Sequence, residues 1–261
     1  MSKKLKYLFS SLLSSAGFYF FLGLPYESRN YGLLVGMVLM IFCIWFGLGI
    51  IFEGDFGLRL ISVILPLIFF VGFGMFTALL PFNFGGRMIL TIIFGLVFYV
   101  IFLVDNVFMV AIGFRTVPLY RAAYTVNLII LLLASFFLFN SLYSYKFDYW
   151  VNTLAVAFLS MLIFIYQFFC IAIELSDDGK NKNKLVYVLV PTFLMAQLAL
   201  VFSFWPVGIF KGSIYLVSAV YVLSGLIEAD IRERLFRKTW LTMIWVGVAI
   251  ILGILLATAW R

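Results

Sequence analysis

Residues 88–113 read MILTIIFGLVFYVIFLVDNVFMVAIG, and this stretch identifies the fold class. Its single charged residue is Asp105, and its apolar residues run on without the polar–apolar alternation of a barrel strand. About 20 consecutive apolar residues are enough for an α-helix to cross the hydrocarbon core of a bilayer. We therefore expect a transmembrane helix here.

The composition extends this expectation to the whole chain. Of its 261 residues, 66% are hydrophobic and 11% are charged, and the mean hydropathy is +1.18. Soluble domains contain about 45–50% apolar and about 25% charged residues. The composition therefore excludes a soluble globular protein, a disordered chain and a coiled coil, and it predicts a membrane protein.

Similar apolar runs recur along the chain and predict an all-α, polytopic transmembrane bundle that forms a single domain over residues 1–261. The connections between the runs are short, so neither side of the membrane is expected to carry a soluble domain. Nine spans are expected, at about 7–24, 32–52, 59–80, 88–113, 118–140, 149–173, 185–205, 209–227 and 239–260. The first is interpreted as an uncleaved span rather than a signal peptide, since no A-x-A-like cleavage site follows it.

The distribution of basic residues predicts the orientation. If the N-terminus lies in the cytoplasm, the inner segments hold thirteen of the 18 Lys and Arg residues and the outer segments hold five. This asymmetry favours an N-in, C-out topology. Because the basic residues stand at the ends of apolar runs, membrane orientation also explains the net charge of +7, and no nucleic-acid partner is expected.

Several classes of chemistry lack the residues that they need. The chain has no histidine, which excludes histidine-based hydrolysis and histidine-ligated metals. Cys43 and Cys170 stand in apolar runs and have no metal-type spacing. No P-loop or GxGxxG motif occurs. We expect no enzymatic activity, no metal site and no cofactor.

Asp105 is the only acid inside a predicted span, about 12 Å from the inner end of its helix. Placing an acid there costs about 2.5–3.5 kcal/mol, so it is a functional candidate by default. Other polar residues are expected in the same layer of the inner half of the bilayer. The candidate layer comprises Asp105, Asn106, Arg115, Arg121, Tyr124, Asn127 and Gln167.

Two interpretations of this layer remain open. In the first, it lines a polar cavity that opens to the cytoplasm and binds a small or anionic group through Arg115 and Arg121. In the second, Asp105 and Arg121 form a buried ion pair that fixes helix packing, and the amides connect neighbouring helices.

A cluster of basic residues lies before the last span. It consists of Arg232, Arg234, Arg237 and Lys238. Its simplest role is to set topology by contacting anionic lipid headgroups. Binding of a protein partner, or of a second copy of the chain, is the alternative.

Several segments of the chain carry a resemblance to known proteins: Leu103–Ala111, Arg115–Ala123, Phe136–Asn140, Asp148–Asn152, Phe202–Pro206 and Arg232–Phe236. In these segments the chain resembles a group of multi-span proteins of unknown function from candidate-phylum (Patescibacteria-type) bacteria. The similarity covers about residues 60–250. It implies a bacterial cytoplasmic (inner) membrane and no particular activity.

The leading functional expectation is a non-enzymatic inner-membrane protein that binds or transports a small polar or lipid-like ligand through the layer around Asp105. The alternative is a membrane scaffold or assembly partner that uses the basic cluster. A third hypothesis is an enzyme that acts on a lipid-linked substrate at the cytoplasmic interface.

Overall fold

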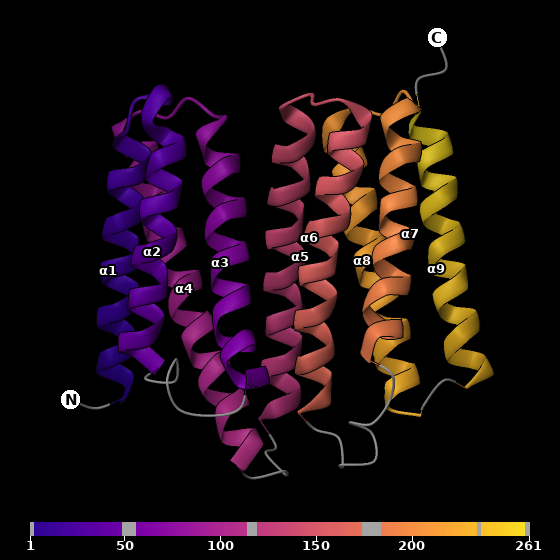
Figure 1. The fold of residues 1–261 in the computed structure, drawn as a ribbon, viewed down its shortest axis with the longest axis horizontal. Helices are drawn as coiled ribbons and strands as arrows, with labels where there is room; N and C mark the ends of the chain where they lie inside the picture. Colours follow the sequence, from indigo (N-terminus) through magenta and orange to yellow (C-terminus); the bar gives the residue numbers. More distant parts are fainter. Residues whose placement is uncertain (1–2, 49–55, 114–118, 174–183, 234–235, 259–261) are drawn as a thin grey trace. The chain divides into compact units, whose positions relative to one another are not determined.

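The computed structural model describes residues 3–48, 56–113, 119–173, 184–233 and 236–258. These residues form nine α-helices and one short 3-10 helix, and no strand occurs among them (Figure 1). The helices are α1 Lys3–Gly23, α2 Arg29–Leu48, α3 Phe56–Ala78, α4 Phe84–Gly113, α5 Tyr120–Ser144, α6 Tyr149–Ala172, α7 Lys184–Phe204, α8 Ile209–Ile231 and α9 Arg237–Ala257, with η1 at Tyr26–Ser28. The all-α prediction is confirmed, and each expected span coincides with one helix.

Helix length and composition indicate a multi-pass membrane protein. Seven of the helices, α1, α2 and α4 to α8, are long and apolar enough to cross a membrane. The apolar parts of α3 and α9 within the described residues are shorter, at Ser62–Ala78 and Trp240–Gly253. Large apolar side chains also remain exposed along these helices, for example Leu34, Val35 and Val38 on α2. Contiguous exposed apolar surface of this kind needs an apolar partner, which lipid would supply.

Two helices end later than the sequence predicted. Helix α5 continues to Ser144 rather than 140, and α8 continues to Ile231 rather than 227. Glu228 and Asp230 therefore belong to the last turns of α8, where we expected a loop. In these turns Glu228 forms an ion pair with Arg232, and Asp230 accepts a hydrogen bond from Tyr187 of α7.

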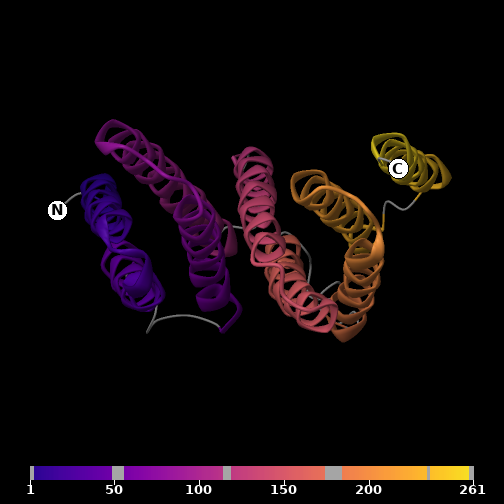
Figure 2. The same cartoon turned by 90° about the horizontal axis from the view of Figure 1, so that it is seen from above.

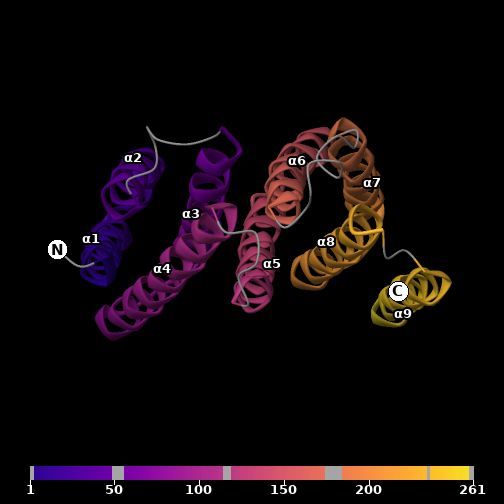
Figure 3. The same ribbon diagram turned by 90° about the horizontal axis from the view of Figure 1, so that it is seen from below.

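The chain folds as two compact units, Met1–Leu138 and Phe139–Arg261, and the division between them falls within the sequence of α5. In the first unit, α1 packs against α2, α3 and α4, and α2 packs against α3. In the second unit, α6 packs against α7 and α8, and α8 packs against α7 and α9. Figure 2 shows the helices from above, and Figure 3, from below, shows α9 beside α8 in the second unit.

Phenylalanine rings form the core of the first unit. Phe69 and Phe73 on α3 are one turn apart, as are Phe94 and Phe98 on α4, so each pair lies on one face of its helix. Phe18 of α1 stacks on Phe94 with the ring centroids 4.3 Å apart and the rings 11° from parallel. Each such aromatic pair adds about 0.5–1.5 kcal/mol to the stabilisation from burial alone. This core holds α1, α3 and α4 together next to the polar residues of α4.

Candidate functional site

Asp105 lies deep inside the first unit. It stands on α4 one turn beyond Ile101 and Phe102, on the face that the other helices cover, and only 1% of the residue is exposed. Neither carboxyl oxygen has a hydrogen-bond partner among the described residues. A buried polar group without a partner costs free energy, and a charged one costs more. Within the described part of the chain, Asp105 is therefore a buried acid without a compensating positive charge or hydrogen-bond donor.

Tyr7 of α1 is the neighbour that the sequence did not reveal. Its hydroxyl donates a hydrogen bond to Oδ1 of Asn106 over 2.8 Å, and it lies within electrostatic range of Asp105. Its ring stacks on Phe102 at 6.2 Å. These contacts place α1 directly beside the polar turn of α4. We had expected neighbours from α5 and α6 only.

Ser10 adds a second polar group from α1. It is fully buried, and its hydroxyl has no hydrogen-bond partner among the described residues. Gly47 of α2 lies against it, and a Cβ atom added there would be 3.0 Å from the Ser10 hydroxyl oxygen. Tyr7, Ser10 and Ser14 share the buried face of α1 at helical spacing. That spacing of polar residues within an apolar span was the signal that could have identified α1 as part of the site.

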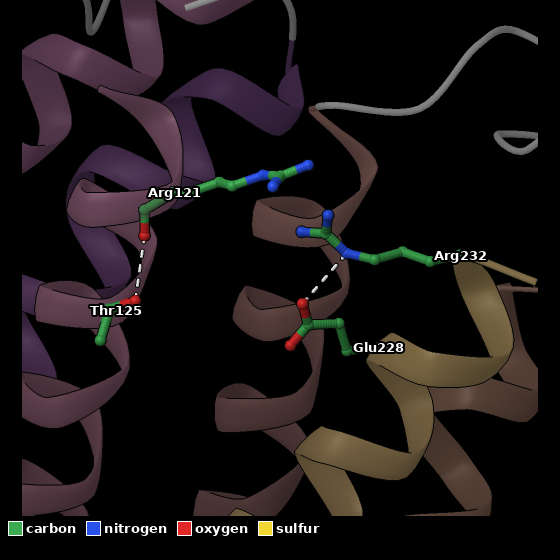
Figure 4. Close-up of polar contacts among 4 residues, drawn as sticks. All are labelled: Arg121, Thr125, Glu228 and Arg232. Atoms are coloured by element: carbon green, nitrogen blue, oxygen red, sulfur yellow. Dashed lines mark hydrogen bonds and ion pairs between the residues drawn. The ribbon is translucent and has the colours of Figure 1, made fainter. Parts of the chain in front are cut away.

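The expected ion pair between Asp105 and Arg121 is not formed among the described residues. Helix α5 begins at Tyr120, so Arg121 lies in its first turn, is exposed, and extends its side chain away from that helix (Figure 4). Its carbonyl oxygen accepts a hydrogen bond from Thr125 over 3.0 Å. The pair is not formed because Arg121 lies in the first turn of α5 and is exposed, whereas Asp105 is buried on α4.

The remaining layer residues divide between the two units. Tyr124 and Asn127 are buried on α5 in the first unit, where Tyr124 stacks on Tyr120 and Tyr120 contacts Phe108 of α4. Gln167 is fully buried on α6 in the second unit. Arg115 lies outside the described residues.

The structure describes the side chains of Arg232 and Arg237 in the basic cluster around the start of α9. Arg232 forms an ion pair with Glu228 one turn earlier on α8, with 3.0 Å between Nε and Oε1 (Figure 4). Arg237 is exposed at the start of α9. Arg234 lies outside the described residues, as does the side chain of Lys238. Of the two side chains that the structure describes, Arg237 is exposed and Arg232 is half-buried.

A family model described as "Protein of unknown function (DUF5656)" matches residues 54–257, which is well over half of the chain. The chain belongs to this family. The DUF5656 match contains Asp105, Asn106, Tyr124 and Asn127, whereas Tyr7 precedes it. No curated protein and no solved structure matches the chain. The expected membership of a family of unknown function is thus confirmed, while the bacterial source that the resemblance implies stays a prediction.

Proposed function

We propose that this DUF5656 protein is a non-enzymatic, multi-pass membrane protein that binds a small monovalent cation, a proton or an alkali-metal ion, at Asp105. The observation that carries the proposal is the buried carboxyl group whose two oxygens lack a partner among the described residues. Placing an ionisable residue inside a membrane span costs free energy, and such residues are usually part of an ion or proton pathway.

The neighbouring groups favour a cation over the anion that the sequence suggested. Carboxylate, phenol and amide oxygens are acceptors for a positive charge, and Asp105, Tyr7 and Asn106 bring these three groups together. Of the two arginines that would bind an anion, Arg121 is exposed in the first turn of α5, away from the buried carboxyl group, and Arg115 lies outside the described residues.

The membrane placement belongs to the same proposal. We place all nine helices across the cytoplasmic membrane of a bacterium, with the N-terminus inside and the C-terminus outside, because the basic residues are distributed in that sense. Membrane lipids are the expected partners of the exposed basic residues, with Arg237 as a contact to anionic headgroups.

Carbodiimide labelling of the purified protein tests the proposal. Dicyclohexylcarbodiimide is apolar and reacts with protonated carboxyl groups, so it should modify Asp105, as detected by peptide mass spectrometry. Sodium or potassium ions should reduce the modification if the ligand is a metal ion. If the ligand is a proton, these salts should have no effect and the modification should fall as the pH rises.

The controls use other residues of the same chain. The Asp105→Asn variant should lose the modification, and exposed Glu27 should remain unmodified in all samples. Modification of Asp105 that responds to neither salt nor pH, or no modification at all, would overturn the proposal. Tyr7→Phe keeps the carboxyl group and removes the neighbouring hydroxyl, so it should weaken protection by a metal ion, or shift the pH response, without abolishing the reaction.

A further inference from the structure

A polar pocket lies at the other end of α4 from Asp105. It has a volume of about 310 Å³, at the lower end of the range of about 300–1,000 Å³ for ligand pockets. Its lining residues are Leu22, Arg29, Thr77, Leu80, Pro81, Phe82, Asn83 and Arg87. Arg87 and Asp105 are separated by 18 residues of one helix, about 27 Å, so this outer pocket is independent of the cation site.

Arg29 is held in the wall of the outer pocket by two helix ends. It is the first residue of α2, and its Nε donates to the carbonyl oxygen of Leu24 over 3.3 Å. One of its terminal nitrogens donates to the carbonyl oxygen of Ala78, the last residue of α3. The guanidinium carries its N–H donors in a rigid plane, so these two contacts fix its orientation in the pocket wall.

Arg87 brings a second guanidinium to the outer pocket. It is half-buried on α4, and its side chain makes no hydrogen bond or ion pair with the residues that the structure describes. No acid lines the outer pocket, so the lining offers the Arg87 guanidinium no counter-ion. Asn83 and the N-terminus of α4 add hydrogen-bond donors and the positive end of the helix dipole.

We propose that the outer pocket binds a phosphate group, carried by a phospholipid or by a phosphorylated solute. Two guanidinium groups match the several oxygens of a phosphate through paired, charge-assisted hydrogen bonds. Leu22, Leu80 and Phe82 supply an apolar rim beside the charges, and Leu80 is exposed. The headgroup of a phospholipid would contact the two arginines, and its acyl chains would contact the apolar rim.

Two binding measurements on the purified protein distinguish a phospholipid from a phosphorylated solute as the source of the phosphate group. Titration with inorganic phosphate in detergent, at constant ionic strength, reports a free phosphate group. Native mass spectrometry after release from nanodiscs of phosphatidylglycerol reports a retained lipid. At least one measurement should show binding to the wild type, and Arg87→Gln should weaken that binding about tenfold or more, as expected for the loss of a charge-assisted paired contact.

Lys146→Gln is the matched control, because it removes one positive charge from an exposed turn of the second unit. It should bind as the wild type does. Arg87→Lys keeps the charge but loses the planar fork, and it should fall between the wild type and Arg87→Gln. Binding of neither probe to the wild type, or equal loss in Lys146→Gln and Arg87→Gln, would overturn the proposal. Thermal unfolding of each variant establishes that it is folded.

Discussion

At the scale of single residues, burial and partnership decide the role of Asp105. An acid within an apolar span can be neutralised by an arginine or by a ligand, and the sequence offers Arg121 for the first. In the structure, Asp105 is buried beside Tyr7, whereas Arg121 is exposed in the first turn of α5. The difference matters because breaking a buried ion pair costs about 3–5 kcal/mol, and the described residues form no such pair with Asp105.

We therefore expect Asp105→Asn to unfold at the same temperature as the wild type or at a higher one. The substitution keeps the size of the side chain, removes a charge and breaks no hydrogen bond among the described residues. Thermal unfolding in detergent, followed by the loss of helical circular dichroism, measures the change.

Arg121→Gln is the companion variant and should also unfold like the wild type. A loss of stability in Asp105→Asn that Arg121→Gln restores would show that the two residues do pair, and it would remove the basis for a cation at this site.

At the scale of helices, close backbone contact positions α3 against α5. Gly72 of α3 lies against the backbone of α5: a Cβ atom added there would be 2.9 Å from the carbonyl oxygen of Ala134. Small residues at helix interfaces allow this approach, which drives helix association in membranes through packing. The aromatic core continues around this contact, because Phe73 of α3 packs edge-on against Phe137 of α5 with the centroids 5.1 Å apart.

We expect Gly72→Ala to destabilise the protein by about 1–3 kcal/mol, since the added methyl group meets backbone that cannot move out of its way. Gly85→Ala is the matched control on α4, where a Cβ atom would meet nothing within 4 Å. It should leave stability unchanged or raise it by up to about 1 kcal/mol through helix propensity. Denaturation of both variants under the same conditions compares them, and equal effects would mean that α3 and α5 are not in tight contact.

At the scale of the whole molecule, the number of helices that cross the membrane sets the topology. Seven qualify by length and composition, and the apolar parts of α3 and α9 among the described residues are shorter. The positive-inside distribution favours nine crossings. The number of crossings before a given turn decides the side of the membrane on which that turn lies. The side on which Lys146 lies therefore tests whether α3 crosses the membrane.

We expect a cysteine in place of Lys146 to react with a membrane-impermeant maleimide on intact bacterial cells. A cysteine in place of Lys4 should react only after the cells are permeabilised. Both positions are exposed, and Cys43 and Cys170, which are buried, would be replaced by alanine in the background. If α3 does not cross, Lys146 moves to the inner side and its labelling pattern becomes that of Lys4.

The candidate site was less predictable than the helices. Asp105 stands out because an acid in an apolar run is costly wherever that helix packs. Tyr7 does not stand out, because tyrosine is common in spans, and only the packing of α1 on α4 places its hydroxyl on Asn106. Arg29 and Arg87 are far apart in sequence and looked like ordinary residues at the ends of spans, yet they line one pocket.

The helices follow from the sequence alone, because a long apolar run that satisfies its own backbone hydrogen bonds needs no information from the rest of the chain. The cost of Asp105 follows from it too, since that cost depends on the apolar residues on either side. The side chains that meet this carboxyl group, and the arginines that share a pocket, are known only from the packed helices. Those contacts depend on how each helix is rotated in the packed structure, and for that reason Arg121, a predicted partner of Asp105, is instead exposed in the first turn of α5.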